Sequence, residues 1–303
     1  MYHQIARNKR KSVIVIVSFF IVWAAIGYVI GFIASGVSGG VAGIIIAAIL
    51  ALLVVLWSLT AGQATVLAVS GAQPVTQQQA PVLYDVVSTL AIGAGLPMPK
   101  VYIINDPSPN AFATGTSPTK AAITCTTGLL AIMNREELEG VIGHEMSHIR
   151  NYDVRLVLIV ATSVALIGLV ASLLWRSLFF TRGGNNRDGG YLIIILIAAA
   201  ALLSVVAVIV GPLMQLALSR SRESLADASS VELTRNPAGL LHALQKLQQN
   251  EKPFAKMTHA TAAMCIDDPL QHHGGFTHHL FDTHPPIEER IATLQAMLQV
   301  KET

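Results

Sequence analysis

The stretch "VIGHEMSHIRNYDVRLVLIVATSVALIGLVASLLW", residues 141–175, places a candidate metal site a few residues before an apolar run. His144, Glu145 and His148 stand in the order H-E-x-x-H. On a helix, residues four apart lie on one face, so both imidazoles can point at a single ion, with Glu145 near a water bound to it. The alternative is a helix that carries two histidines by chance, and the rest of the chain must decide between these interpretations.

The composition indicates a membrane protein. Of the 303 residues, 52% are hydrophobic and 13% are charged, whereas soluble proteins carry about 25% charged residues. The net charge of +2 is too small to indicate a nucleic-acid-binding surface, and we expect no nucleic-acid partner. Cys125 and Cys265 are the two cysteines. Because they show no C-x-x-C spacing, we expect free thiols in a reducing compartment rather than a disulfide.

Four apolar runs without charged residues interrupt the chain, at residues 12–35, 41–59, 156–175 and 191–218. Each is close to or above the roughly 20 residues that a helix needs to cross a bilayer. Aromatic residues lie at the ends of the runs, where the membrane interface favours them. We therefore predict four transmembrane helices, arranged as hairpins over residues 12–59 and 154–218. The predicted helices are residues 12–35, 41–59, 154–178 and 191–218.

A basic segment, residues 1–11, precedes the first apolar run. A cleaved signal peptide is the alternative interpretation, but this run is longer than a usual signal core and a second run follows almost at once. We predict a retained helix with residues 1–11 in the cytoplasm, because basic residues flank membrane helices on that side. The arginines within residues 176–187 are a weaker sign for the opposite orientation.

Two segments outside the runs, residues 60–153 and 219–303, are predicted to form one cytoplasmic domain. In the first, an amphipathic helix closed by Gly95 precedes three short strands, "KVYII", "NAFATG" and "AAITCTTG". The H-E-x-x-H helix should begin at Asn134, with Glu137 as its capping-box partner. The expected fold class is predominantly α with a small β-sheet (α+β).

A third metal ligand is the next requirement, since catalytic zinc usually takes three protein ligands. The sequence "SRSRESLADAS" puts Glu223 and Asp227 one helical turn apart. Glu223 can bind the ion while Asp227 accepts the outer N–H of a ligating histidine. The alternative is a solvated carboxylate pair near Arg220 and Arg222.

The order of elements favours the metal site. His148 lies shortly before the third apolar run and Glu223 shortly after the fourth. Two crossings return the chain to its starting side, so both residues reach the same membrane surface. We therefore expect one Zn2+ ion per chain.

The quoted motifs resemble a known family. "GHEMSHIRNYD", "SRSRESLADASSVELTRNP" and "DTHPPIEERI", with "NAFATG" upstream, resemble the HtpX family of membrane-bound zinc endopeptidases over essentially the whole chain. They look more distantly like the CAAX prenyl proteases. The resemblance implies a gluzincin-type domain in which zinc is bound by His144, His148 and Glu223 and in which Glu145 is the catalytic base.

The resemblance also implies roles for further residues. Asn110, Ala111 and Phe112 match a strand that forms the edge of the cleft and pairs with an extended substrate. His284 and Arg290 match positions that face the scissile carbonyl in the prenyl-protease relatives, where a donor stabilises the oxyanion.

The expected function is cleavage of misfolded or damaged membrane proteins at the cytoplasmic face of a prokaryotic plasma (inner) membrane, as part of quality control and the stress response. Unfolded polypeptides and the lipid bilayer are expected partners, and other membrane quality-control proteases are candidates. A CAAX-type processing protease is the alternative within the enzyme class. A transporter is disfavoured because the apolar runs lack ionisable residues, and a non-catalytic scaffold because Glu145 is intact. Residues 271–284 are rich in histidine, which is interpreted as a loop rather than a second metal site.

Overall fold

The computed structural model describes residues 2–181, 220–250, 265–266 and 285–302, together with a few positions within 193–204. The chain divides by its contacts into two compact units. The mixed unit, which contains helices and a sheet, comprises Met1–Lys9, Gly62–Leu158 and Gln215–Thr303. The apolar unit comprises Arg10–Ala61 and Ile159–Met214.

The mixed unit contains a sheet of four strands in the order β1-β2-β4-β3. The strands are β1 (Gln73–Pro74), β2 (Lys100–Ile104), β3 (Ala111–Ser117) and β4 (Lys120–Thr126). Strands β3 and β4 form an antiparallel hairpin, whereas β2 runs parallel to β4. The hairpin requires Gly115, because a Cβ there would collide with the carbonyl oxygen of Lys120. These strands confirm the small sheet predicted from the sequence.

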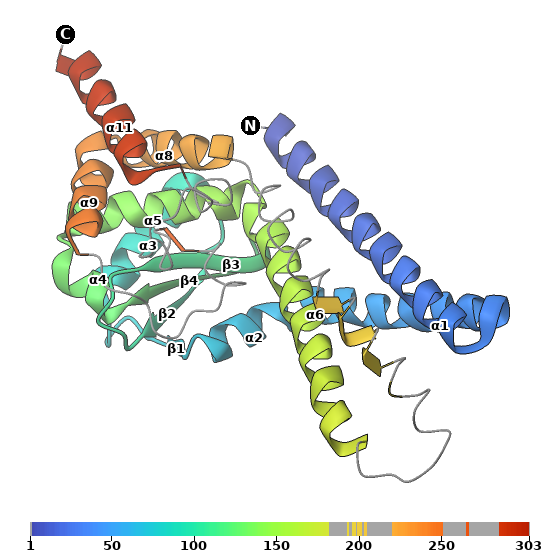
Figure 1. Ribbon diagram of the computed structural model, residues 1–303. Coiled ribbons are helices and arrows are strands. Elements are labelled where there is room, and N and C mark those ends of the chain that lie inside the picture. Colours follow the sequence, from blue (N-terminus) through green and yellow to red (C-terminus); the bar gives the residue numbers. More distant parts are fainter. Residues whose placement is uncertain are drawn as a thin grey trace. The chain divides into compact units, whose positions relative to one another are not determined.

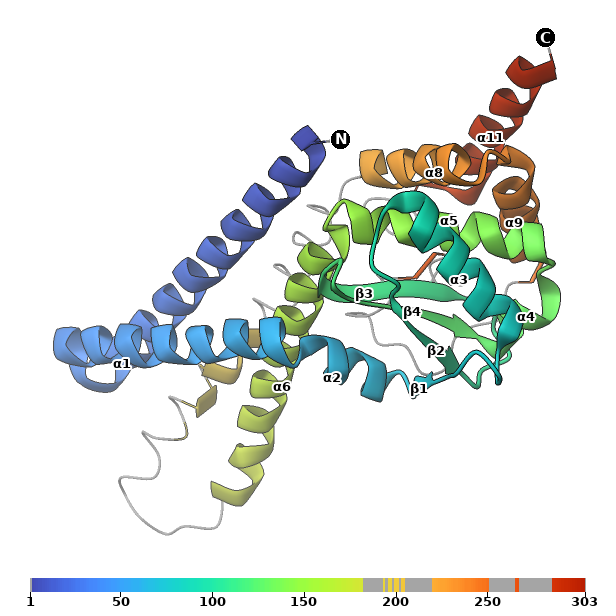
Figure 2. The ribbon, with the colours of Figure 1, turned by 180° about the vertical axis from the view of Figure 1, so that it is seen from behind.

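Helices pack on the sheet and on one another in the mixed unit (Figure 1). They are α2 (Gly62–Val69), α3 (Pro81–Ala94), α4 (Thr127–Ile132), α5 (Arg135–Arg150), α8 (Arg220–Thr234), α9 (Pro237–Gln249) and α11 (Ile287–Glu302). Helix α5 is central, since it packs against β3, α3, α8 and α9, and Figure 2 shows α3 beside it from behind. The α+β class is confirmed.

Local signals at the helix ends are confirmed. Asn134 caps α5, and its side chain and that of Glu137 form the reciprocal bonds of a capping box. Gly95 ends α3 in the left-handed conformation, with φ of 65°. Within α5, Val141, Ile142 and Met146 are completely buried, so burial of this helix in the core holds the H-E-x-x-H segment in place.

The apolar unit contains most of α1 (Tyr2–Thr60) and of α6 (Asp153–Thr181). Helix α1 breaks at Ser35 and Gly36, where the backbone is not helical, and so has two arms. The arms approach closely because glycines face each other: a Cβ on Gly31 would collide with the carbonyl oxygen of Gly39. The predicted loop between residues 35 and 41 is therefore shorter than expected, and the second arm begins just after Gly36.

Within the described residues, two helical segments are long and apolar enough to cross a membrane by length and composition, Arg10–Thr60 and Asp153–Arg176. Large apolar side chains along α1, among them Val13, Ile21 and Leu53, are exposed. Such a surface is stable when lipid covers it. The predicted helix 191–218 lies almost entirely outside the described residues, so four membrane helices remain a prediction.

Both cysteines are buried, and no disulfide joins them. Cys125 lies in β4, and the backbone of Cys265 forms an isolated antiparallel β-bridge with Phe112 of β3. Burial and, after it, the charge of Glu145 raise the pKa of the Cys125 thiol. Cys125 is therefore a neutral thiol at physiological pH.

Candidate metal centre

Helix α5 brings two imidazoles together. His144 and His148 lie one turn apart, and their Nε2 atoms are separated by 3.1 Å. His144 is fully buried and His148 is largely so. The helical spacing explains this geometry, because residues four apart project from the same face.

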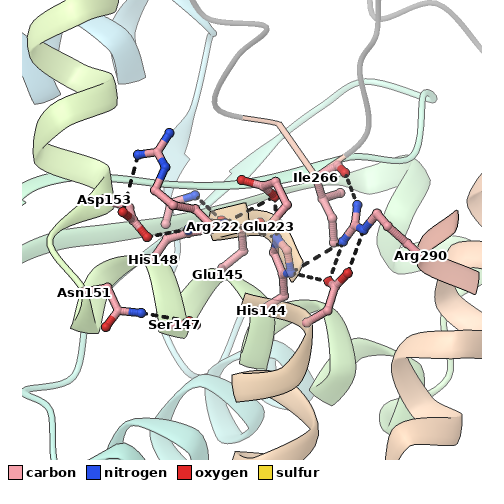
Figure 3. Close-up of polar contacts among 12 residues, drawn as sticks. His144, Glu145, Ser147, His148, Asn151, Asp153, Arg222, Glu223, Ile266 and Arg290 are labelled. Atoms are coloured by element: carbon pink, nitrogen blue, oxygen red, sulfur yellow. Dashed lines mark hydrogen bonds and ion pairs between the residues drawn. The ribbon is translucent and has the colours of Figure 1, made fainter. Parts of the chain in front are cut away.

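Helix α8 adds a carboxylate to the pair. Oε2 of Glu223 lies 3.3 Å from Nε2 of His144 and 3.7 Å from Nε2 of His148. The ligand atoms of the three residues all lie within 4.8 Å of one another, and Figure 3 shows the three side chains converging. The alternative of Glu223 and Asp227 as a solvated pair is wrong, since both residues are buried.

Carboxylates behind the histidines orient both rings. Oδ1 of Asp227 lies 2.8 Å from Nδ1 of His144, and Oδ2 of Asp153 lies 3.2 Å from Nδ1 of His148. An ionised carboxylate only accepts, so each Nδ1 donates its hydrogen. In the neutral rings, both Nε2 atoms then carry a lone pair, and they lie 3.3 and 3.7 Å from Oε2 of Glu223. Three electron-rich atoms this close repel one another unless a cation lies among them, so the donor set fits a metal ion.

The pKa values of the histidines agree with this electrostatic picture. Burial lowers the pKa of His148, but the charge of Glu223 and the hydrogen bond to Asp153 outweigh it, so the net pKa is well above the usual value. Burial likewise lowers the pKa of His144, but the hydrogen bonds to Asp227 and Glu223 outweigh this effect, so the net pKa is raised. The site therefore attracts positive charge, which a proton or a metal ion can supply.

Asp153 is a site residue whose role the sequence analysis missed, although it ends the motif "GHEMSHIRNYD". It follows His148 by five residues, just past the end of α5, and this spacing was the available signal. The guanidinium of Arg222 approaches Oδ1 of Asp153 at 3.4 Å. Arg222, the residue before Glu223, thus connects α8 to the start of α6.

Arg290 binds Asp227, the carboxylate that orients His144. Its Nε and Nη2 donate to Asp227 at 2.9 and 2.7 Å, and its Nη1 donates to the carbonyl of Ile266 at 3.0 Å. Arg290 is 4% exposed, and Nη2 lies 3.4 Å from Nδ1 of His144. The predicted role of Arg290 at a substrate carbonyl stays a prediction. His284, the other residue predicted for that role, lies outside the described residues.

Arg290 also determines the charge of Asp227. Burial raises the pKa of Asp227, but the positive charge of Arg290 and the hydrogen bonds outweigh it and hold the pKa below the usual range. Asp227 is therefore ionised and can keep the His144 ring oriented.

Glu145 lies between the histidines and the sheet. Its Oε2 accepts a hydrogen bond of 2.8 Å from the backbone N–H of Ala113 in β3. Burial, the largest effect, raises the pKa of Glu145, while the neighbouring histidines lower it, and the net shift is upward. A carboxylate with a raised pKa accepts a proton more readily than an ordinary carboxylate does, as a general base requires.

The edge strand begins beside this carboxylate. Of the three residues predicted to bind substrate, Asn110 precedes β3, and Ala111 and Phe112 begin it. The N–H of Ile266 donates to the carbonyl of Ala111 at 3.0 Å, next to the bridge between Phe112 and Cys265. The first residues of β3 therefore already pair with another part of the chain.

Comparison with known proteins shows similarity over nearly the whole chain. Residues 77–298 match the model of peptidase family M48. A protease HtpX homolog of Streptococcus mutans serotype c is 46% identical over 300 residues, covering 97% of this chain and 99% of that protein. One from Lactobacillus helveticus is 41% identical over 302 residues, covering 98% and 100%. The crystal structure of S. mikatae Ste24p matches with a TM-score of 0.49 and 19% identity, over 81% of this chain and 57% of that one.

Proposed function

Because this chain belongs to peptidase family M48 and is a membrane metalloprotease, we propose that it hydrolyses peptide bonds with a zinc ion held by His144, His148 and Glu223. The observation that carries the proposal is the convergence of these three ligand atoms, with oriented histidines, beside the carboxylate of Glu145. Ligands about 2.0–2.1 Å from a tetrahedral zinc lie roughly 3.3 Å apart. The distances of 3.1, 3.3 and 3.7 Å between the ligand atoms support this fit.

The residues around the ligands have separate roles in peptide hydrolysis. When bound, zinc supplies Lewis acidity, which polarises a carbonyl and makes water more acidic. Glu145 accepts the proton of the attacking water and returns it to the leaving amine. The N–H of Ala113 holds the Glu145 carboxylate in place, while Asp227 and Asp153 keep both imidazoles oriented. Burial around Glu145 strengthens each of these interactions.

We propose that substrate binds along β3 as an added strand. Backbone groups of alternate residues point to the same side of a strand. Ala111 accepts a hydrogen bond from Ile266, and Ala113 donates one to Glu145. These bonds indicate that the backbone N–H and C=O groups of Ala111 and Ala113 point away from β4. Because the segment at Ile266 already pairs with Ala111, an extended peptide would pair further along, from the carbonyl of Ala113 to Gly115. Such pairing grips backbone, which favours broad specificity and requires a locally unfolded substrate.

We further propose that the substrates are misfolded or damaged membrane proteins, cleaved at the cytoplasmic face of a prokaryotic plasma membrane. The exposed apolar side chains of α1 support a membrane protein, and the bacterial relatives are named as proteases. A CAAX-type processing protease would instead cut a single C-terminal motif. Cleavage of a prenylated CAAX peptide together with inactivity on unfolded membrane proteins would contradict the proposal.

The test compares wild-type protein with Glu145→Gln, purified at full length in detergent. Gln keeps the shape of Glu145 but cannot act as a base, so cleavage of an unfolded membrane protein should fall about 10²- to 10⁴-fold. Zinc content should stay near one ion per chain in both proteins.

The control is Glu136→Gln, which makes the same chemical change at an exposed position of the same helix and should cleave like wild type. A chelator should stop cleavage by the wild type, and added zinc should restore it. Equal cleavage by wild type and the Glu145 variant would overturn the proposed mechanism.

A further inference from the structure

We propose that Asn8, which precedes the first apolar run, is a positioning residue of the metal centre. It holds Asp153, which in turn orients the ligand His148. The inference rests on the proposed zinc site. It adds a residue that lies 145 positions before Asp153 in the sequence, outside every motif of the zinc site.

The side chain of Asn8 is buried and donates hydrogen bonds to two residues of the turn between α5 and α6. Asn8 is 3% exposed, although basic residues surround it in the sequence. Its Nδ2 donates to Oδ1 of Asp153 at 2.7 Å and to the carbonyl of Asn151 at 3.0 Å. One amide group therefore binds the backbone and a side chain on either side of Tyr152.

Tyr152 is the strained residue in this turn between α5 and α6. Its φ is 61°, in the left-handed region that residues with large side chains rarely adopt. Such a conformation persists when surrounding contacts hold it. Both bonds of the Asn8 amide span Tyr152, so Asn8 stabilises the turn that presents Asp153 to His148.

The two oxygens of Asp153 have different partners. Oδ2 accepts from the ring of His148, and Oδ1 accepts from Asn8. Among the described residues, the other donor to Oδ1 is Arg222, at the longer distance of 3.4 Å. Without the amide of Asn8, Asp153 keeps the longer contact with Arg222, and the turn loses the hydrogen bond from Asn8 to the carbonyl of Asn151.

The two histidines are supported in parallel ways. His144 is oriented by Asp227, which Arg290 holds with two hydrogen bonds. His148 is oriented by Asp153, which Asn8 holds. The outer partner of a ligating histidine typically contributes 10- to 100-fold to metal affinity. A chain with all its zinc motifs intact should therefore bind zinc weakly if Asn8 is lost.

The experiment measures zinc release from full-length protein in detergent, using a chromogenic chelator as the zinc acceptor. Asn8→Ala should release zinc about 10-fold faster than wild type. Asn8→Ser, which keeps one donor on a shorter side chain, should fall between the two and carries the test if the alanine variant misfolds. Arg10→Ala is the control, because it also truncates a polar side chain to alanine but at an exposed position of α1 two residues further on, and it should release zinc like wild type.

A double-mutant cycle separates positioning from general damage. In an Asp153→Ala background, Asn8→Ala should change the release rate less than about 2-fold, because the connection to His148 is already broken. Unchanged release from Asn8→Ala in otherwise wild-type protein would overturn the inference while leaving the proposed function intact. An equal effect of Asn8→Ala in both backgrounds would also overturn it. A wild-type protein that binds no zinc would contradict the proposed function itself, and the inference with it.

Discussion

At the scale of single residues, the metal centre depends on a buried carboxylate, Asp227, which is stabilised by ion pairing with Arg290. Asp227 is buried, and an isolated carboxylate in such a place would be strongly destabilising. Arg290 compensates for this burial with two hydrogen bonds and donates a third to Ile266. Arg290 therefore connects the outer partner of His144 to the segment that pairs with the edge strand.

Replacing Arg290 by Met should lower the free energy of unfolding by about 3 kcal/mol or more, because Asp227 is left as a buried charge without its partner. The measurement is denaturant unfolding with a chelator present, so that zinc does not contribute. The pKa of Asp227 is lowered in the folded wild type, so the stabilisation is fully present above the unfolded value of about 3.9. It is lost as the pH falls through the folded pKa.

The matched control is Arg135→Met, since Arg135 forms ion pairs with Asp85 and Glu139 on the surface. Water screens such pairs, so this variant should lose much less stability. Similar losses in the two variants would show that Arg290 does not compensate a buried charge.

At the scale of elements, α5 works because its neighbours approach it closely. Gly140 and Gly143 face α9 and α8, and a Cβ on Gly143 would lie 2.7 Å from Oγ of Ser230. Ser230 in turn donates to the carbonyl of Gly140. This close packing of α8 on α5 brings Glu223 within reach of the two histidines.

Gly140→Ala should destabilise the mixed unit, because the new Cβ would lie 2.5 Å from the backbone nitrogen of Leu240. The backbones of α5 and α9 must then separate, at a cost of about 1–3 kcal/mol. Thermal unfolding in detergent measures the loss, and cleavage activity should fall with it.

Gly93→Ala provides the comparison for this change. On α3, the added methyl meets a side-chain atom of Leu233 at 3.3 Å and no backbone atom within 4 Å. Alanine also favours a helix over glycine by about 1 kcal/mol. This variant should unfold at or above the wild-type temperature, and a loss as large as that of Gly140→Ala would contradict the packing argument.

At the scale of the whole molecule, membrane topology determines whether the site can form. The ligands His148 and Glu223 flank residues 154–218, so that segment must cross the membrane an even number of times if it crosses at all. The cluster of the three ligand atoms in the mixed unit agrees with this requirement. The side of the membrane on which the cluster lies stays a prediction.

Reporter fusions test that prediction. Alkaline phosphatase fused after residue 303 should be inactive and a fluorescent protein there should fluoresce, because both termini are expected in the cytoplasm. Alkaline phosphatase inserted between residues 182 and 190 should be active on the opposite side. An active phosphatase at the C-terminus would refute the predicted orientation.

The sequence by itself determined the local features of this protein. The capping box at Asn134, the αL cap at Gly95, the short strands and the helical pairing of His144 with His148 depend on neighbours a few residues away, so spacing reveals them. The family resemblance carried by the separated motifs is confirmed by the M48 match and the HtpX homologs.

Beyond the meeting of Glu223 and Asp227 with the histidines of α5, only the tertiary structure decided which distant groups meet. No periodicity indicates that Asn8 binds Asp153, 145 residues later, or that Arg290 holds Asp227 and Ile266. The sheet order β1-β2-β4-β3 and the pairing of Ile266 with Ala111 likewise join segments far apart in the chain. The physical reason is that local structure follows short-range sterics and hydrogen bonds, whereas these contacts form only when packing buries polar groups that must then find partners.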